Sequence, residues 1–278
     1  MADASTVTLG DYQIEIATQF GPRVIGLRRR VGPQILASLG PDAAIEHPGG
    51  MYRFHGGHRL WAAPENAEVT YANDDHPCQV DIDDDSATIL AGSDSAGVRK
   101  EITLRVDGDS LVVDHSISWQ TESVHSALAA WAITQFPLGG VALMPIGGVD
   151  TGSLPNRQLV YWPYTNPADE RIHYIRDGVS VEARGEHRLK LGVGPTRVRL
   201  GYLRESWLFT KEVLSSSVGT VPDLGAGSQV YVGQGFCELE SLGGLEEGLS
   251  AQVTERWGLH PCAALDDAWA IVTGGNGQ

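Results

Sequence analysis

The feature that most constrains the fold of this chain is a long succession of short runs rich in Val, Ile, Leu, Thr and Tyr. Glycine and proline punctuate these runs along the whole sequence, with 34 glycines and 14 prolines. Along residues 111–117, every second side chain (Leu, Val, His, Ile) faces one way, as in a strand. Val106-Asp107-Gly108-Asp109, between two runs, is a hairpin signal. The pattern predicts an all-β fold of mainly antiparallel strands.

The apolar runs predict individual strands, and the C-terminal residues predict one helix. The tail alone has mixed three- and four-residue apolar spacing, which predicts a short C-terminal helix from Pro261 to about Val272. Gly40–Gly57 and Gly139–Pro155 are expected to be long loops, where β scaffolds often hold ligands. No repeat, linker or break in composition divides the chain, so we expect one domain over residues 1–278. The expected strands are Tyr12–Ala17, Arg23–Arg29, Cys78–Ile82, Ala87–Ala91, Arg99–Val106, Ser110–Trp119, Ala127–Phe136, Leu159–Trp162, Val179–Glu182, Arg197–Leu203, Leu208–Val213, Gln229–Leu242 and Leu249–Gly258.

The charge balance narrows the classes of partner. Lys and Arg number 20 against 35 Asp and Glu, a net charge of −15. This balance argues against nucleic acid and against an anionic membrane surface as partners, because a protein that binds either of them needs a basic surface patch. The chain has no apolar run of 18 residues, and its first residues do not show the basic stretch followed by an apolar stretch that is typical of a secretory signal peptide. These features predict a cytoplasmic protein. Three scattered cysteines form no CxxC pair and are expected to be buried thiols.

The run from His55 to Glu65 is the richest in groups that bind ligands and do chemistry. Paired glycines let its backbone approach a ligand closely, Arg59 offers several planar donors, and Trp61 offers a flat apolar face. We expect His58 to act as a general acid, and Arg59, Trp61 and Glu65 to bind substrate. An alternative is a structural pair between Arg59 and Glu65. A second alternative is a divalent metal held by His55, His58 and Glu65, with recruits such as His115 or His125. His115 is itself expected to be a satisfied core histidine.

A second run, Glu238 to Gly244, places two carboxylates on one face of an expected strand. Glu238 and Glu240 are two residues apart and share that face, while Leu239 takes the other. If Leu239 lies in the core, both carboxylates face a cleft; the alternative is a solvated face. Further candidates for substrate binding are Arg23, Trp131, Gln135, Trp162, Tyr164 and Lys211.

Taken in order, several segments resemble a poorly characterised bacterial branch of the galactose mutarotase-like (aldose 1-epimerase-like) superfamily. The resemblance covers roughly residues 8–258 and implies a β-supersandwich with a sugar-sized cleft on one sheet. The segments that carry it are 21–27 (GPRVIGL), 56–65 (GGHRLWAAPE), 131–135 (WAITQ), 162–167 (WPYTNP), 238–243 (ELESLG) and 255–257 (ERW).

The resemblance also implies a mechanism. In characterised mutarotases a late-strand Glu followed by Thr removes the anomeric proton, and a histidine protonates the ring oxygen. Glu240-Ser241 matches the first motif, which makes Glu240 the expected base. The central-strand Asn-His pair has no match, because Ala130-Trp131 or Thr134-Gln135 stands in its place. Either His58 has taken over the acid role, or the protein does something other than mutarotation.

These observations predict a carbohydrate-active enzyme that uses acid–base chemistry, with aldose anomer interconversion as the default reaction. No cofactor is expected, and the expected partner is a small carbohydrate rather than nucleic acid or a membrane. One alternative is a sugar-binding or regulatory module without turnover. Another is a metal-dependent sugar isomerase or lyase that uses His55, His58 and Glu65. The sequence carries no indication of an oligomeric state.

Overall fold

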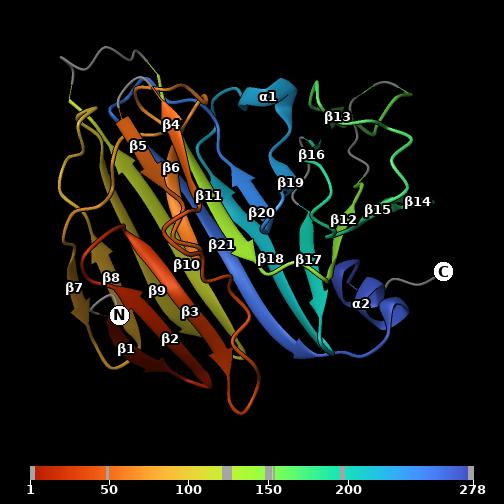
Figure 1. Cartoon of the computed structure of the whole chain (residues 1–278), viewed down its shortest axis with the longest axis horizontal. Helices are drawn as coiled ribbons and strands as arrows, with labels where there is room; N and C mark the ends of the chain where they lie inside the picture. The colour runs from red at the N-terminus through yellow and green to blue at the C-terminus, as the bar shows by residue number, and fades with distance from the viewer. Residues whose placement is uncertain are drawn as a thin grey trace.

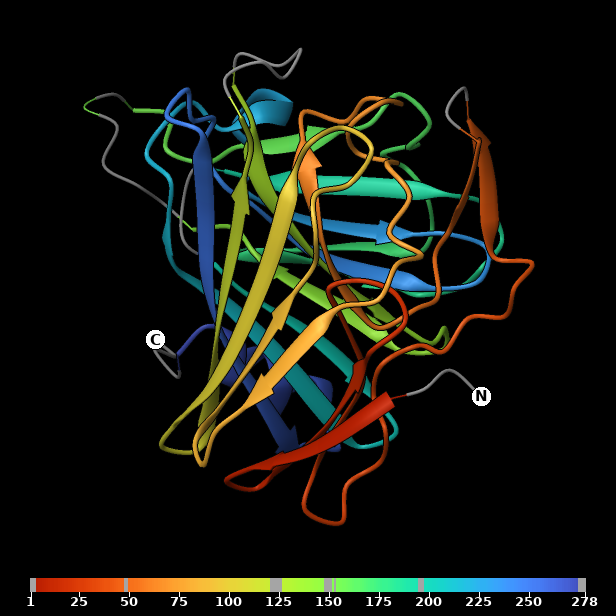
Figure 2. The ribbon, with the colours of Figure 1, turned by 90° about the vertical axis from the view of Figure 1, so that its left-hand side faces the viewer.

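The alternating runs assemble into two large antiparallel sheets that pack face to face in the computed structural model (Figure 1, Figure 2). The structure describes residues 4–47, 50–120, 127–147, 152, 154–194 and 198–274. The all-β expectation is confirmed. None of the helices in these described ranges is long and apolar enough to cross a bilayer.

The first sheet has nine strands and carries most of the residues discussed below. In spatial order it contains β1 (Ala4–Leu9), β2 (Tyr12–Ala17), β3 (Arg23–Arg29), β6 (His58–Ala63), β11 (Ala129–Phe136), β20 (Cys237–Leu242), β19 (Ser228–Val232), β16 (Leu189–Val193) and β13 (Leu159–Tyr161).

The second sheet has ten strands and packs against the inner face of the first, as Figure 2 shows. Its order is β14 (Ile172–Ile175), β15 (Gly178–Glu182), β12 (Val141–Pro145), β17 (Arg199–Arg204), β18 (Trp207–Ser216), β21 (Ser250–Pro261), β10 (Ser110–Ser118), β9 (Arg99–Asp107), β8 (Ser86–Leu90) and β7 (Gln79–Ile82). The described part of the chain also contains a separate antiparallel pair, β4 (Ala44–His47) and β5 (Gly50–Arg53), and the helices α1 (Pro222–Gly225) and α2 (Leu265–Val272).

The central strands of the nine-stranded sheet are buried on both faces. Every residue of β6, β11 and β20 is buried. Their inner side chains, such as Leu60, Ala130 and Leu239, join the main core between the sheets. The apolar side chains of their outer face join a second cluster that also includes Tyr52 of the β4–β5 hairpin. Side-chain alternation therefore decides which residues enter the core between the sheets and which lie on the outer face.

A polar network crosses the core between the sheets. His115 Nδ1 lies 2.9 Å from the Val253 carbonyl oxygen, which can only accept, so Nδ1 carries the proton. His115 Nε2 then accepts from His58 Nε2 at 2.7 Å, and His58 Nδ1 accepts from the Thr134 hydroxyl at 2.9 Å. Both imidazoles are fully buried, with all four ring nitrogens partnered, in line with the expectation of a satisfied core histidine at position 115.

A buried ion pair lies beside this network. The Lys211 ammonium of β18 is 2.8 Å from Glu255 of β21 and donates to the backbone carbonyls of Ala132 and Leu239, each at 3.2 Å. The indole of Trp257 donates to the same carboxylate at 2.7 Å. A charge removed from water needs partners of this kind to remain ionised. The pair and its backbone contacts thus join the two sheets.

Several local expectations need correction. The expected loops hold regular structure: Gly40–Gly57 contains β4 and β5, and Gly139–Pro155 contains β12. The expected strand Gln229–Leu242 is two antiparallel strands, β19 and β20, because the chain reverses at the segment containing Gly233 and Gly235. The short C-terminal helix is confirmed as α2. Cys237 and Cys262 are buried as expected, whereas Cys78 is half-buried.

The buried histidine pair predicts a loss of stability at mildly acidic pH. Burial lowers the pKa of both His58 and His115 below the ordinary value near 6.5. The unfolded chain takes up protons near pH 6.5 and the folded chain does not, so stability falls as pH decreases through that range. Protonation would also set two N–H donors against each other across the 2.7 Å contact. We expect the unfolding free energy to be lower at pH 5.5 than at pH 7.5 by at least about 1 kcal/mol.

Denaturant unfolding of the wild type and of a His58→Gln, His115→Gln double variant at both pH values measures this effect. His76→Gln, at an exposed position, is the matched control and should leave the pH dependence unchanged. A double variant with the same pH dependence as the wild type would contradict the prediction.

Candidate active site on the outer face of the nine-stranded sheet

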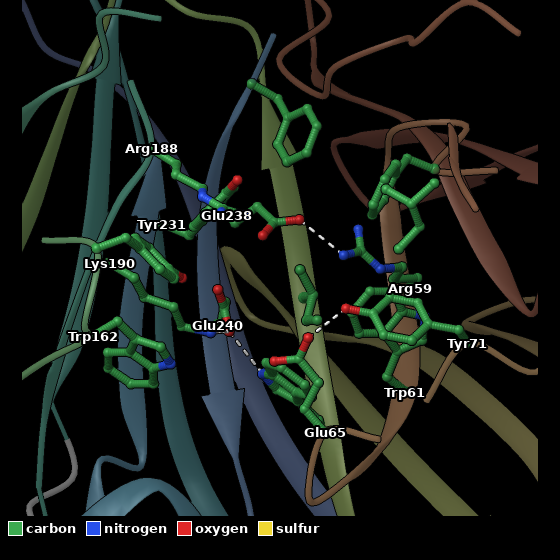
Figure 3. A pocket seen from close by; sticks show the side chains of 16 residues that line it. Arg59, Trp61, Glu65, Tyr71, Trp162, Arg188, Lys190, Tyr231, Glu238 and Glu240 are labelled. Carbon is green, nitrogen blue, oxygen red and sulfur yellow. Dashed lines mark hydrogen bonds and ion pairs between the residues drawn. The ribbon is translucent and has the colours of Figure 1, made fainter. Parts of the chain in front are cut away.

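A cavity of about 260 Å³ opens on the outer face of the nine-stranded sheet, the face turned away from the ten-stranded sheet (Figure 3). Strands β6, β11, β20, β19 and β16 contribute to its lining, together with the loops around them. The lining residues are Ile45, Phe54, Arg59, Trp61, Glu65, Tyr71, Trp131, Ile133, Trp162, Tyr164, Arg188, Lys190, Tyr231, Phe236, Glu238 and Glu240.

The two late-strand carboxylates both line this cavity. Leu239 is fully buried in the main core, and Glu238 and Glu240 on either side of it face the opposite way. The expectation that the carboxylates face a cleft rather than solvent is therefore confirmed. Strand register also brings them beside the early basic segment, because Ile133 of β11 pairs with Glu240 on one side and with Arg59 on the other.

Glu240 is held by one of its two carboxylate oxygens. Its Oε2 accepts a hydrogen bond from the Trp131 indole at 2.8 Å and from the Lys190 ammonium at 2.7 Å. Its Oε1 is buried and has no hydrogen-bond partner among the residues that the structure describes. Burial raises the pKa of Glu240 above its ordinary value, and Lys190 acts in the opposite direction. The carboxylate is thus oriented through Oε2, and Oε1 is the oxygen that no hydrogen bond from the described residues holds.

Lys190 lies between two indole rings. Its ammonium is 4.7 Å from the ring centres of both Trp131 and Trp162, within the range of cation–π attraction. Lys190 was not among the residues expected at the site, because the sequence analysis assigned no strand to Leu189–Val193. The alternation of apolar residues in that segment could have predicted its position. Leu189, Leu191 and Val193 enter the core, so Lys190 faces the opposite way, into the cavity.

Glu238 is held by a second buried ion pair. Arg59 Nη2 donates to Glu238 Oε1 at 2.9 Å, and Gln135 Nε2 donates to the same oxygen at 2.9 Å. The Arg59 guanidinium lies 4.0 Å from the ring centre of Trp61. Its Nε and Nη1 are buried, and within the described part of the chain they have no hydrogen-bond partner. Arg59 therefore pairs with Glu238, not with Glu65, and retains unused donors.

The remaining wall is aromatic and is fixed through Tyr52. The Tyr52 hydroxyl accepts from the Trp61 indole at 2.8 Å and from Arg23 at 3.1 Å. Arg23 itself is fully buried, pairs with Asp74 at 2.8 Å and does not line the cavity. The Tyr71 hydroxyl donates to Glu65. Figure 3 shows Tyr71 and Arg59 on one side of the cavity, with Lys190 and Trp162 facing them.

The structure contradicts the placement of three expected site residues. His58 lies on the inner face of β6, because it immediately precedes the outward-facing Arg59, and its imidazole is occupied in the network between the sheets. Lys211 is likewise buried between the sheets against Glu255. Arg23 supports Tyr52 from outside the lining. Gln135 also lies outside it, but contacts the site through Glu238.

The expected metal ligands are not brought together. His55 Nε2 lies 2.6 Å from Asp75, His58 contacts His115, and Glu65 accepts from Tyr71. In the described part of the chain, the ligand atoms of His55, His58 and Glu65 do not form a cluster of metal-binding size. The proposed recruit His125 lies outside the described residues. The alternative prediction of a metal site formed by His55, His58 and Glu65 is therefore wrong.

Several lining residues on the rim and the hairpin side of the cavity were not predicted from the sequence. Arg188 and Tyr231 alternate with core residues of their segments, and this alternation could have revealed them. Tyr71 and Phe236 lie in connecting segments, where no periodic pattern marks the side-chain direction. The full missed set is Ile45, Phe54, Tyr71, Ile133, Arg188, Lys190, Tyr231 and Phe236.

Comparison with solved structures shows the fold. A candidate aldose 1-epimerase from Escherichia coli K12 is similar with a TM-score of 0.53 and 12% identity, over 93% of this chain and 99% of that one. A candidate aldose 1-epimerase from Klebsiella pneumoniae is similar with a TM-score of 0.55 and 9% identity, over 100% and 90%. Family models and curated proteins give no match. The fold is galactose mutarotase-like, as the sequence resemblance implies.

The geometry around Glu240 predicts a strong dependence of stability on Lys190. Replacing Lys190 with Met leaves a buried carboxylate without its cation, and we expect a loss of about 3 kcal/mol of unfolding free energy. Adding Glu240→Gln removes the uncompensated charge, so the double variant should be more stable than Lys190→Met alone. Denaturant unfolding of the two single variants and the double variant gives the coupling energy.

The matched control is Arg105→Met, which breaks a solvent-exposed ion pair with Asp114 at 3.1 Å. Its effect should stay within about 1 kcal/mol. Additive losses at positions 190 and 240 would show that the two groups do not stabilise each other.

Proposed function

We propose that this cavity binds a sugar and catalyses acid–base chemistry at its hemiacetal carbon, with interconversion of the two anomers as the reaction. The mutarotase-like fold supports a carbohydrate ligand. The volume of about 260 Å³ suits one monosaccharide unit, and the lining combines indole faces with charged groups that bind hydroxyls.

The observation that carries the proposal is the arrangement of Glu240. Ring opening needs a base at the anomeric hydroxyl, and a base needs a fixed direction and a free lone pair. Trp131 and Lys190 fix Oε2, while Oε1 of this cavity-lining residue has no partner in the described ranges. Burial raises the pKa of Glu240, which makes the carboxylate a stronger base than an exposed one.

Ring opening also needs a proton donor at the ring oxygen. No histidine lines the cavity among residues 4–47, 50–120, 127–147, 152, 154–194 and 198–274. Tyr71 lies across the cavity from Lys190 and is hydrogen-bonded to Glu65 (Figure 3). Burial and the adjacent Glu65 raise the pKa of Tyr71, so the phenol keeps its proton at neutral pH. We assign the proton-donating role to Tyr71, whose hydroxyl donates to Glu65 in the free protein and would turn to donate to the ring oxygen when a sugar is bound.

The second candidate function is a sugar-binding module without turnover. Two observations favour it: the lining in the described ranges has no imidazole, and the Lys190 ammonium contacts the proposed base, which lowers its basicity. Both functions share the same ligand class and cavity. They differ in whether the bound sugar changes anomer faster than it does in water.

Glu240→Gln separates the two functions. It keeps the shape of the side chain but removes the base, so the rate of anomer interconversion should fall by about 10²–10⁴-fold. Polarimetry or NMR of freshly dissolved single anomers measures the rate, and calorimetry measures binding by the same proteins. Glu186→Gln, at an exposed position, is the control and should keep the full rate.

Retention of the wild-type rate by Glu240→Gln would remove Glu240 from the base role. Sugar binding by a wild-type protein that does not accelerate interconversion would select the binding module.

Tyr71→Phe tests the proton donor. The variant keeps the ring that packs against Trp61 at 5.1 Å between centres and removes only the hydroxyl. We expect kcat to fall by at least about tenfold with little change in sugar binding, since a positioned acid contributes mainly to the transition state. An unchanged kcat would assign the role to another group.

A further inference from the structure

We propose that the sugar bound here carries an anionic substituent, a carboxylate or a phosphate, and that Arg188 binds it. The inference names the substrate class of the site described above and rests on the function proposed for it. It depends on how the charged side chains of the cavity are paired.

Most of the charge in the cavity is already neutralised. Arg59 pairs with Glu238 at 2.9 Å, and Lys190 pairs with Glu240 at 2.7 Å. Both pairs are buried, so each behaves toward a ligand as a neutral unit with hydrogen-bonding capacity. Among the charged lining residues, this leaves one cation, Arg188, and one anion, Glu65.

Arg188 differs from the neighbouring arginine of its own segment. Arg184 lies outside the cavity and is within 4 Å of carboxylate oxygens of Glu170, Glu182 and Glu186. In the part of the chain that the structure describes, Arg188 has no such carboxylate, although it lies in a protein with a net charge of −15. Its guanidinium lies over the face of Tyr164, 4.9 Å from the ring centre.

Stacking on Tyr164 orients the guanidinium and leaves its hydrogen-bond donors free. A guanidinium donates two parallel hydrogen bonds to a carboxylate or phosphate, and such charge-assisted bonds are about twice as strong as neutral ones. Arg188 is exposed at the mouth of the cavity, whereas the proposed base is buried at its floor. An anionic group on a sugar whose anomeric carbon faces Glu240 would thus be held at the rim.

The rest of the cavity fits an otherwise hydroxyl-rich ligand. In the view of Figure 3, Arg188 and Glu65 lie on opposite sides of Glu240. Glu65 accepts hydrogen bonds, which suits hydroxyls and repels a second anionic group. The geometry therefore points to a sugar with one anionic end near Arg188 and hydroxyls toward Glu65.

Paired ligands test the charge alone. Calorimetry would compare D-glucuronate and D-galacturonate with the corresponding neutral hexuronamides, and the two hexose 6-phosphates with the free hexoses. We expect at least one anionic ligand to bind about tenfold or more tightly than its neutral partner, and this preference to weaken with added salt. Which of the two series shows the preference distinguishes a carboxylate from a phosphate.

Arg188→Gln should reduce the preference for the anionic ligand over its neutral partner to within about threefold. Arg184→Gln removes a charge from the same segment outside the cavity and should keep the preference. Arg188→Lys keeps the positive charge but loses the planar guanidinium that can donate two parallel hydrogen bonds, so this variant should retain part of the preference for the anionic ligand.

Equal binding of charged and neutral partners by the wild type, or an undiminished preference in Arg188→Gln, overturns the inference while the proposed sugar site stands. Absence of binding by every sugar tested overturns the proposed function and this inference together.

Discussion

Side-chain alternation along three doubly buried strands is the constraint on which the site depends. In β6, β11 and β20, one set of side chains enters the core between the sheets and the other lines the cavity. A shift of register by one residue would exchange the sets, placing Leu239 in the cavity and Glu240 in the apolar core. The chemistry of the cavity and the packing of the core are therefore set by the same register.

Burial of charge is tolerated in the nine-stranded sheet and beneath it because the buried ionic side chains of the site and of the core behind it pair with a group of opposite charge on another strand. Arg59 reaches Glu238, Lys190 reaches Glu240, and Lys211 reaches Glu255. These pairs cross between strands rather than lying along one strand, so they form only when the sheets are assembled. Such pairs contribute less to net stability than to a single correct arrangement, because removing either partner leaves a charge in an apolar environment.

Local patterns in the sequence predicted much of the fold and part of the site. The period-two runs predicted β2 and β3 with their observed bounds, and the position of Leu239 predicted the direction of Glu238 and Glu240. The same rule, applied to His58 next to Arg59, would have separated these two residues. The paired glycines before His58 obscured it, since the preceding turn leaves the start of the strand undefined. Tyr71 and Glu65 come together through a loop, and no local pattern encodes that contact.

The Lys211 ammonium contacts the backbone behind the cavity, and this has a consequence for how related proteins can diverge. It ties Ala132 of β11 and Leu239 of β20 to the opposite sheet, directly beneath the strands that carry Trp131 and Glu240. The floor of the cavity is thereby anchored independently of the loops that form its rim. Changes in rim residues could alter which sugar is accepted while the reactive carboxylate keeps its position, so selectivity can evolve separately from chemistry on this scaffold.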